Sequence, residues 1–373
     1  VKRLEREITR VETSIAAVVF LLAASELDAW PCLVNARLAG AEIDTFRELT
    51  QCRLAVYTIG DSPSAAQHAA EDTAQVLEDR IFGRVAIGRT NANCRPEPVE
   101  NDKSRQVGAV IFTSGTTGKA KAVMLSHQAV MYMGATMAIY RQVRSDDTFY
   151  IVVPLSHVIG LGAALFTAFW VGASAELVPR YAPEHLARAL LNNRVSHLLG
   201  VSTMYRRLIE YGEVHGLDLG SPRLRMLGAG GAPMDLALKR DTETALGLPL
   251  RNSYGMTENN PIARTLEGAD DDAIGEIQPG VELRLVDTDG RDVGTGESAE
   301  IWVRGPSCML GYYRDEEATR AALRPGGWLA TGDVETPVAY ASRLGAVSRE
   351  EVLKAAAALQ LGAVVTVRVG GVN

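Results

Sequence analysis

The stretch Thr113-Ser114-Gly115-Thr116-Thr117-Gly118-Lys119-Ala120-Lys121 decides how this sequence is interpreted. It follows the apolar run Gly-Ala-Val-Ile-Phe at 108–112, which predicts a buried β-strand. Glycines, hydroxyl side chains and lysines together give a loop of free backbone N–H groups, short donors and positive charge, as polyphosphate binding requires. It is not a Walker A loop, because only two residues separate Gly115 from Gly118 and Ala120 stands where a Ser or Thr would hold magnesium. Taken alone, a flexible surface loop explains the stretch equally well.

Strands and helices alternate on both sides of this loop. Residues 11–58 predict helix, strand, helix and strand, whereas 61–105 are polar and carry most of the linker signals. Ser126 is placed to cap a helix running through Met137, and another helix is expected over 183–192. Further strands are expected at 149–153, 197–200, 224–227 and 249–251. This alternation predicts an α/β fold with mostly parallel, helix-covered sheets.

From about residue 271 the pattern changes to antiparallel β-structure. Residues 281–286 and 300–304 alternate apolar and polar side chains on either side of the turn Asp287-Thr288-Asp289-Gly290. The tail from residue 348 predicts one helix and a strand at 364–369, too little for an independent domain. We therefore predict an α/β body of two subdomains over 1–270, a smaller β-rich, barrel-like subdomain over 271–337 and a short tail over 338–373.

Three further segments carry groups suited to a nucleotide. The first, Gly228-Ala229-Gly230-Gly231-Ala232, follows a predicted strand and lets a flat ring lie against the backbone. The second, Asn252-Ser253-Tyr254-Gly255-Met256-Thr257-Glu258, offers an aromatic face, a hydroxyl and a carboxylate that can hold Mg²⁺ between phosphates. The third, Thr331-Gly332-Asp333, ends in an acid that can accept hydrogen bonds from ribose hydroxyls. Each segment alone also has a purely structural explanation as a turn, a core tyrosine or a helix start.

The composition indicates a globular protein and argues against a nucleic-acid-coating surface. The chain of 373 residues is 47% hydrophobic and has a net charge of −7, whereas phosphate contacts to nucleic acid need clustered basic residues. The four cysteines are far apart, with no CxxC or Cys/His cluster, so a reducing compartment, the cytoplasm, is expected. The apolar segment 14–24 resembles a secretory signal but is too short for a membrane span, so we interpret it as a buried helix and expect no integral membrane segment.

The four motifs, in this order, resemble the adenylate-forming superfamily of acyl-CoA synthetases, aryl-CoA ligases, luciferases and peptide-synthetase adenylation domains. The resemblance covers roughly residues 11–334 and includes Pro154-Leu155-Ser156-His157 and residues 305–313. It implies the fold of the large N-terminal adenylation domain and a two-step reaction. A carboxylic acid attacks the α-phosphate of ATP, giving an acyl-adenylate and pyrophosphate, and coenzyme A then takes the acyl group. The chain is most similar to the fatty-acyl and aryl-CoA ligases, which implies fatty or aromatic acid metabolism.

The resemblance also implies roles for individual residues. Tyr254 would stack on adenine, Asp333 would bind the ribose hydroxyls, Thr257 would reach the α-phosphate and Glu258 would hold Mg²⁺. The catalytic residues would be Lys119, Thr257 and Glu258. The remaining ATP-binding residues would be Thr113, Ser114, Gly115, Thr116, Thr117, Gly118, Gly230, Gly231, Ala232, Asn252 and Gly255. The acyl pocket is expected to include His157 and Tyr205.

The C-terminal part departs from the superfamily pattern. A hinge and a mobile domain with a catalytic lysine should follow Thr-Gly-Asp, but residues 334–343 show no Gly-Arg hinge and Lys354 does not fit the role. We therefore expect the mobile domain to be missing. The chain is then part of an ordinary ligase, a ligase with an unreliable tail sequence, or a shortened homologue that binds nucleotide or acyl-adenylate with little or no turnover. A P-loop NTPase is disfavoured by the loop spacing. The acid, a carrier-protein thiol in place of coenzyme A and a possible homodimer stay open.

Overall fold

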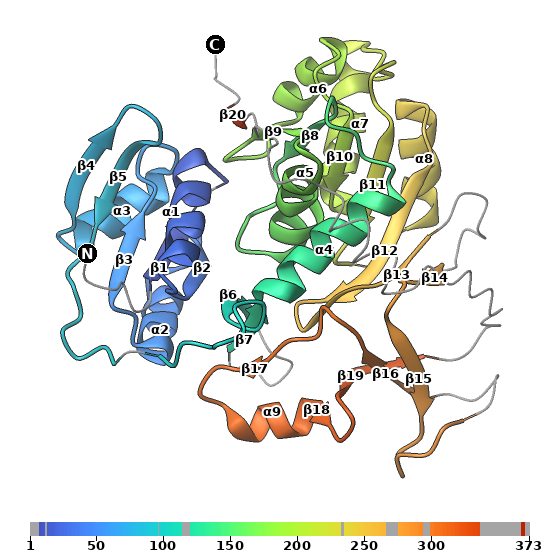
Figure 1. Cartoon of the computed structure of the whole chain (residues 1–373). Coiled ribbons are helices and arrows are strands. Elements are labelled where there is room, and N and C mark those ends of the chain that lie inside the picture. Colours follow the sequence, from blue (N-terminus) through green and yellow to red (C-terminus); the bar gives the residue numbers. More distant parts are fainter. Residues whose placement is uncertain are drawn as a thin grey trace.

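The structure, a computed structural model, describes residues 7–11, 13–95, 97–113, 120–232, 235–265, 275–293, 299–335 and 367–369. Its strands form three β-sheets (Figure 1). In Figure 1 strands β1 to β5 of the first sheet are drawn in blue and most of the second sheet in green to gold, and the third sheet, in orange, lies below the second.

The first sheet is mixed. Parallel pairs join β1 to β2 and β3, and β2 to β6, whereas antiparallel hairpins β6–β7 and β4–β5 flank this centre. Across the sheet its strands are β17 (Gly311–Tyr312), β7 (Lys121–Ser126), β6 (Val107–Thr113), β2 (Pro31–Asn35), β1 (Glu7–Val11), β3 (Leu54–Tyr57), β5 (Gly83–Ile87) and β4 (Gln75–Asp79).

The second sheet is mainly parallel. All pairs from β12 across to β20 are parallel, and β13 and β14 add antiparallel strands at the other edge. Across the sheet its strands are β14 (Glu276–Ile277), β13 (Asn259–Arg264), β12 (Leu250–Met256), β11 (Met226–Gly230), β10 (His197–Gly200), β8 (Thr148–Ile151), β9 (Ser174–Leu177) and β20 (Val367–Val369).

The third sheet is wholly antiparallel and uses strands between residues 282 and 335. Its order is β15 (Glu282–Val286), β16 (Ala299–Arg304), β19 (Trp328–Glu335) and β18 (Leu323–Arg324). The α/β fold with a smaller antiparallel part, expected from the sequence, is therefore confirmed. The first sheet is more mixed than expected, because its hairpins add antiparallel strands at both sides.

Helices pack against the sheets. They are α1 (Ile15–Glu26), α2 (Gly40–Thr50), α3 (Pro63–Glu71), α4 (His127–Tyr140), η1 (Ile159–Phe166, a π-helix), α5 (Thr167–Val171), α6 (Pro183–Leu191), α7 (Ser202–His215), α8 (Leu236–Leu246) and α9 (Glu316–Ala322). Helix α9 contacts β17 of the first sheet as well as β18 and β19 of the third. In the described part of the chain, none of these helices has both the length and the apolar character that a membrane span requires.

Most predicted elements are confirmed. The Ser126 hydroxyl accepts a hydrogen bond from the Ala129 N–H and caps α4, and the apolar segment 14–24 forms most of α1. The interpretation of 61–105 as a polar linker is wrong, since it contains α3, β4 and β5. The missed strand β4 lies at the sheet edge with every side chain exposed, so it has no apolar alternation to detect. The helix predicted from residue 348 lies outside the described residues.

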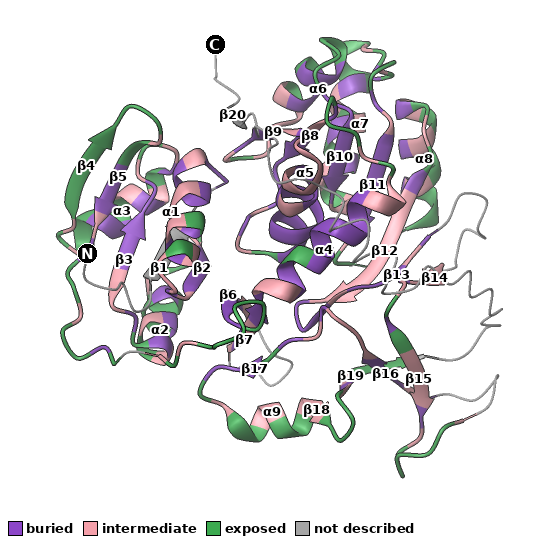
Figure 2. Ribbon diagram, in the orientation of Figure 1, coloured by how far each residue is buried: buried purple, intermediate pink, exposed green. Residues whose placement is uncertain are grey.

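One hydrophobic cluster reaches all three sheets and surrounds α4. It includes Leu33, Ile111, Met133, Phe149, Leu165 and Val303. Figure 2 shows α4 and the central strands of the second sheet mainly buried, and β4 exposed. Gly134 permits the close packing of α4 on η1, because a Cβ atom there would lie 2.6 Å from the Phe166 carbonyl oxygen. This packing fixes α4 and η1, which both line the site described next.

Candidate active site

Thr257 and Glu258 form the tight connection between the antiparallel strands β12 and β13. The sequence predicted a strand that ends at residue 251, but β12 continues to Met256, so the polar motif lies mostly on a strand. Both residues are buried, with 8% of Thr257 and 6% of Glu258 exposed. Gly255 packs closely against the Asn260 side chain, because a Cβ atom there would lie 2.6 Å from the Asn260 Nδ2 atom.

The carboxylate of Glu258 is held by a tyrosine from the C-terminal part of the chain. The Tyr312 hydroxyl donates a hydrogen bond of 2.8 Å to Glu258 Oε1, and the Met309 N–H donates one of 2.8 Å to the Glu258 carbonyl. Burial and the negative charge of Glu258 raise the pKa of Tyr312, so its hydroxyl keeps its proton and acts as the donor. The Lys121 Nζ atom lies 4.7 Å from the centre of the Tyr312 ring. Lysine, tyrosine and glutamate thus form one contiguous group.

A cavity of about 540 Å³ is lined by Lys121, Tyr312 and Glu258 and by residues of two other motifs. Its lining includes Thr113, Lys121, Glu258, Thr331 and Gly332. Thr113 and Lys121 are hairpin partners at the two ends of the Gly/Thr-rich loop. This cavity therefore lies beside that loop, the Thr-Glu pair and the Thr-Gly-Asp motif.

Tyr254 and Asp333, 79 residues apart in the sequence, are in direct contact. The Tyr254 hydroxyl donates a hydrogen bond of 2.5 Å to Asp333 Oδ2, which joins β12 of the second sheet to β19 of the third. The turn at Asp333 is ordered by neighbouring groups, since the Asp333 N–H donates to the Thr331 hydroxyl and the Gly332 N–H to Glu300 Oε1. The aromatic ring and the carboxylate predicted to bind adenine and ribose are thus brought together.

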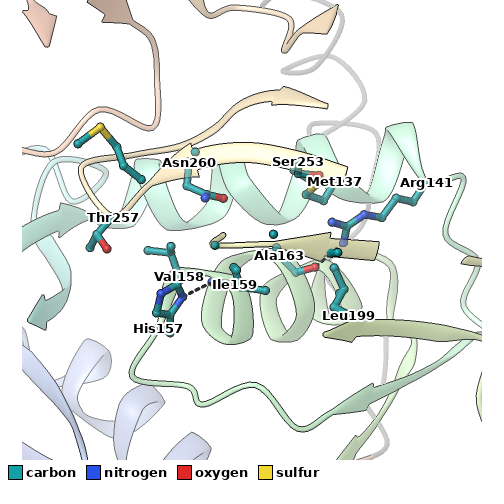
Figure 3. Close-up of a pocket in the computed structure, with 15 residues that line it drawn as sticks. Met137, Arg141, His157, Val158, Ile159, Ala163, Leu199, Ser253, Thr257 and Asn260 are labelled. Atoms are coloured by element: carbon teal, nitrogen blue, oxygen red, sulfur yellow. Dashed lines mark hydrogen bonds between the residues drawn. The ribbon is translucent and has the colours of Figure 1, made fainter. Parts of the chain in front are cut away.

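A smaller cavity of about 160 Å³ lies on the other side of residues 255–257 (Figure 3). Gly230, Gly231, His157 and Thr257 are in its lining. The Ile159 N–H donates a hydrogen bond of 3.4 Å to His157 Nδ1, which leaves Nε2 to carry the proton of the neutral ring. Surrounding protein lowers the pKa of His157 by desolvation, so the neutral ring is favoured.

A wide cleft of about 980 Å³ opens next to this small cavity, between β2 and α2 on one side and the second sheet on the other. The two hollows share His157, Ile159 and Gly231 in their linings. Its other lining residues include Leu38, Phe46 and Met204, so much of its wall is apolar.

A model of the AMP-binding enzyme family matches residues 4–313. This chain belongs to the AMP-binding enzyme family. The resemblance to the adenylate-forming superfamily is thereby confirmed. The first three motifs lie within the matched residues, whereas Thr331-Gly332-Asp333 lies beyond them.

Relatives of this chain include proteins that are named as carboxylic acid–CoA ligases. It is 33% identical over 238 residues to a 3-[(3aS,4S,7aS)-7a-methyl-1,5-dioxo-octahydro-1H-inden-4-yl]propanoyl:CoA ligase of Mycobacterium tuberculosis, covering 62% of this chain and 44% of the relative. It is 30% identical over 342 residues to a mitochondrial malonate–CoA ligase of Homo sapiens, covering 79% and 59%. The ATP-bound structure of MatB from Rhodopseudomonas palustris superimposes with a TM-score of 0.71 at 26% identity, covering 90% of this chain and 66% of that one. The chain spans about half the length of the curated relatives it matches.

One residue predicted for the acyl pocket lies elsewhere in the structure. Tyr205 was expected in the acyl pocket, but it is 1% exposed and packs in the hydrophobic cluster on the far face of the second sheet. Its hydroxyl donates a hydrogen bond of 2.7 Å to the Gly228 carbonyl, and it is in the lining of neither the small cavity nor the wide cleft among the described residues. The prediction for Tyr205 is therefore wrong: it is a core residue that is hydrogen-bonded to β11.

Other predicted residues lie at the margins of this site. Asn252 is half-buried on β12, where its side-chain oxygen accepts a hydrogen bond from the Ser253 N–H. Ala232 is exposed at the end of the glycine-rich segment, next to Gly231, whose φ of 80° favours glycine. The loop residues Ser114, Gly115, Thr116, Thr117, Gly118 and Lys119 lie outside the described residues.

Lys121 is a site residue that the sequence analysis did not select. It was quoted in the loop, but the catalytic role was given to Lys119. Its pairing opposite Thr113 in the β6–β7 hairpin places it at the cavity with Glu258. The sequence could have indicated this position, because the strand β7 begins at Lys121 and this lysine therefore stands at the end of the loop.

The carboxylate of Glu258 fits a magnesium ion held with a nucleotide. Its Oε1 atom accepts from Tyr312, and the side chain lines the cavity that Lys121 also lines. No group of three or more His, Cys, Asp or Glu side chains suited to a metal occurs within the described segments. The Glu258 carboxylate in this cavity suits Mg²⁺, which is usually held by one or two carboxylates together with substrate phosphates.

Proposed function

We propose that this chain carries out the ATP-dependent activation of a carboxylic acid in an acid–CoA ligase. One observation carries the proposal: consecutive residues of one turn line two different cavities. Thr257 lines the small cavity, Glu258 lines the cavity beside the phosphate loop, and Met256 lines both. An acid in the first cavity and the phosphates of ATP in the second would therefore meet at this turn.

The chemistry of the first step is mainly electrostatic. A carboxylate is already a nucleophile at neutral pH, so the attack on the α-phosphate needs no general base. The site must bring two anions together and stabilise the negative charge that grows on the phosphate oxygens. In this proposal Lys121, the Thr257 hydroxyl and a magnesium ion held by Glu258 would stabilise this charge. Tyr254 and Asp333, which are hydrogen-bonded to each other, would bind adenine and ribose.

Thioester formation would use the wide cleft. In this proposal the thiol of coenzyme A reaches the activated acyl group past His157, which lies between the two hollows. The relatives include ligases named for fatty, aromatic and malonic acids. Their names therefore do not identify the acid that this chain would activate. The second candidate is the alternative drawn from the sequence, a homologue that binds the nucleotide with little turnover.

The direct test is pyrophosphate release by the full chain with Mg·ATP and a panel of short, medium, long-chain, aromatic and dicarboxylic acids. Hydroxylamine in the assay traps an acyl-adenylate as a hydroxamate. Acid-dependent pyrophosphate together with hydroxamate supports the proposal. Calorimetric titration with Mg·ATP separates the failures: binding without pyrophosphate identifies the second candidate, and neither binding nor pyrophosphate overturns both.

A further inference from the structure

The small cavity contains a positively charged side chain at the end remote from the reacting turn. Arg141 follows the last residue of α4, and its guanidinium lines the cavity. In Figure 3, Arg141 lies at one end of the lining residues, and His157 and Thr257 lie at the other. The Arg141 Nη1 atom donates a hydrogen bond of 2.6 Å to the Ala163 carbonyl of η1.

This hydrogen bond uses one of the five N–H groups of the guanidinium. Among the described residues no carboxylate forms an ion pair with Arg141. Two nearby side chains, Arg251 and Arg264, are also positively charged and lower its pKa. By contrast, Arg264 has the acid Glu276 nearby. Burial and the neighbouring cations lower the pKa of Arg141 to about 9, so it remains charged at neutral pH. Arg141 is half-buried, and a cation that is partly removed from water without a neighbouring anion is costly, so such groups are normally paired.

A second polar side chain lines the small cavity near Arg141. The cavity has room for a small molecule only. Ser253 lines the same cavity, and its hydroxyl makes no hydrogen bond to any residue that the structure describes. In Figure 3, Ser253 and Met137 lie near the Arg141 end. The volume of about 160 Å³ is close to that of a cavity that holds benzene, roughly 150 Å³. A long alkyl chain does not fit in this space.

We propose that the acid activated here is a short α,ω-dicarboxylic acid, whose distal carboxylate is bound by Arg141 and Ser253. This inference rests on the proposed function and names its substrate class. The proximal carboxylate would lie at Thr257, where it meets the α-phosphate, and the distal carboxylate would supply the anion that Arg141 lacks. Guanidinium and carboxylate match geometrically and form strong charge-assisted hydrogen bonds.

The experiment compares dicarboxylates with monocarboxylates of similar length in two readouts. Malonate, succinate, glutarate and adipate are tested against butyrate, hexanoate and benzoate, by pyrophosphate release and by calorimetric binding of the acid in the presence of AMP. We expect one of the dicarboxylates to be preferred. Arg141→Gln should reduce its kcat/KM and its affinity by about 10- to 100-fold, the range for a hydrogen bond to a charged group, and leave butyrate within a few-fold.

The matched control is Arg144→Gln, which removes an exposed arginine three residues further along the same segment. It should change neither readout. Arg141→Lys keeps the charge and should retain part of the preference. Circular dichroism and retained butyrate binding show that Arg141→Gln is folded.

Failure of this inference differs from failure of the proposed function. Preference for monocarboxylates, or a dicarboxylate preference unchanged in Arg141→Gln, overturns the role of Arg141 while ligase activity stands. If no acid gives pyrophosphate, the binding readout alone decides: a dicarboxylate that binds through Arg141 supports the inference, and no dicarboxylate binding overturns it.

Discussion

At the scale of the residue, the hydroxyl of Tyr312 determines how the Glu258 carboxylate is oriented. The hydrogen bond between them is buried, and the raised pKa of Tyr312 keeps its proton in place. The neighbouring Tyr313 offers a matched comparison, because its hydroxyl donates to Glu97 and its ring packs against Trp30, away from the cavity lined by Glu258. Substituting each of these adjacent tyrosines in turn therefore distinguishes loss of the hydrogen bond to Glu258 from a general loss of packing.

We expect Tyr312→Phe to weaken the response to magnesium without unfolding the protein. Losing one hydrogen bond to a charged group costs about 1.5–3 kcal/mol, so the Mg²⁺ concentration for half-maximal ATP binding should rise by about 10- to 100-fold. Calorimetric titration of ATP at a series of Mg²⁺ concentrations measures this. Tyr313→Phe should leave the magnesium response unchanged, and equal effects of the two substitutions would contradict a positioning role for Tyr312.

A second residue-scale expectation concerns pH and stability. The His197 side chain has no exposed surface, stacks on Phe149 with ring centres 4.6 Å apart, and burial lowers its pKa to about 4. In the unfolded chain the same group takes up a proton near its ordinary pKa of about 6.5. The unfolded state therefore binds more protons between these values, and stability should fall as the pH decreases from about 6.5 to 4, by up to about 1.4 kcal/mol per pH unit from this group.

Urea unfolding at several pH values measures this effect. In His197→Gln the fall in unfolding free energy across that interval should be smaller than in the unsubstituted chain. His215→Gln, which changes a histidine that stacks on Tyr211 at an exposed position, serves as the control and should keep the full pH dependence. An unchanged slope in His197→Gln would show that other groups control acid stability.

At the scale of the element, the contact between α4 and η1 sets the shape of the small cavity. We expect Gly134→Ala to destabilise the protein by about 1–3 kcal/mol, because the new Cβ atom would lie 2.6 Å from a backbone oxygen and the helices must separate. Acid binding should weaken as well, since Met137, Arg141 and Ala163 on these segments line the cavity. Urea unfolding and acid titration measure the two effects.

Gly40→Ala is the matched control for this substitution. Gly40 begins α2, and a Cβ atom there would meet nothing within 4 Å. We expect it to be neutral or to stabilise the protein slightly, as Ala favours the helix more than Gly does. A similar loss of stability in both variants would indicate helix propensity effects unrelated to the α4–η1 contact.

Elements with a strong local signal could be predicted from sequence, and elements shaped by the site could not. The helix α4 was identified from the cap at Ser126, and β10 from a short apolar run at 197–200. By contrast, β12 continues through Asn252, Ser253 and Gly255, which have low strand propensity. Its extension is stabilised by pairing with β13, a tertiary condition that local composition does not encode.

At the scale of the whole molecule, the candidate site is built from all three sheets. Thr113 belongs to the first sheet, Tyr254 to the second and Asp333 to the third. A nucleotide bound to all three would link parts of the chain that otherwise meet through the shared core. The sequence could predict Tyr254 and Asp333 as one site because their motifs are recognisable. It could not select Lys121 or Arg141, whose roles depend on which elements pack beside them.

We expect Mg·ATP to raise the melting temperature of the whole chain. A ligand at about 100 times its Kd stabilises the native state by about 2.7 kcal/mol. Differential scanning fluorimetry should show this rise, and a chelator that removes Mg²⁺ should reduce it. Hydrogen exchange should slow in β12 and β19 together.

Asp333→Asn tests the link to the third sheet. It should reduce the shift caused by Mg·ATP and leave the melting temperature without ligand close to that of the unsubstituted chain, because Asp333 is exposed. Asp289→Asn, at an exposed turn of the same sheet, should leave the ligand-induced shift intact. A full shift in Asp333→Asn would remove this carboxylate from the nucleotide site.

The shared wall of the small cavity and the wide cleft has a consequence for inhibitor design. His157, Ile159 and Gly231 line both hollows, so a compound that reaches from one hollow into the other would pass these three residues. Such a compound would carry a compact anionic head for the Arg141 end and a long apolar arm for the cleft. The anionic head would bind in the narrow hollow, because Arg141 is among the described lining residues of that hollow and not among those of the cleft.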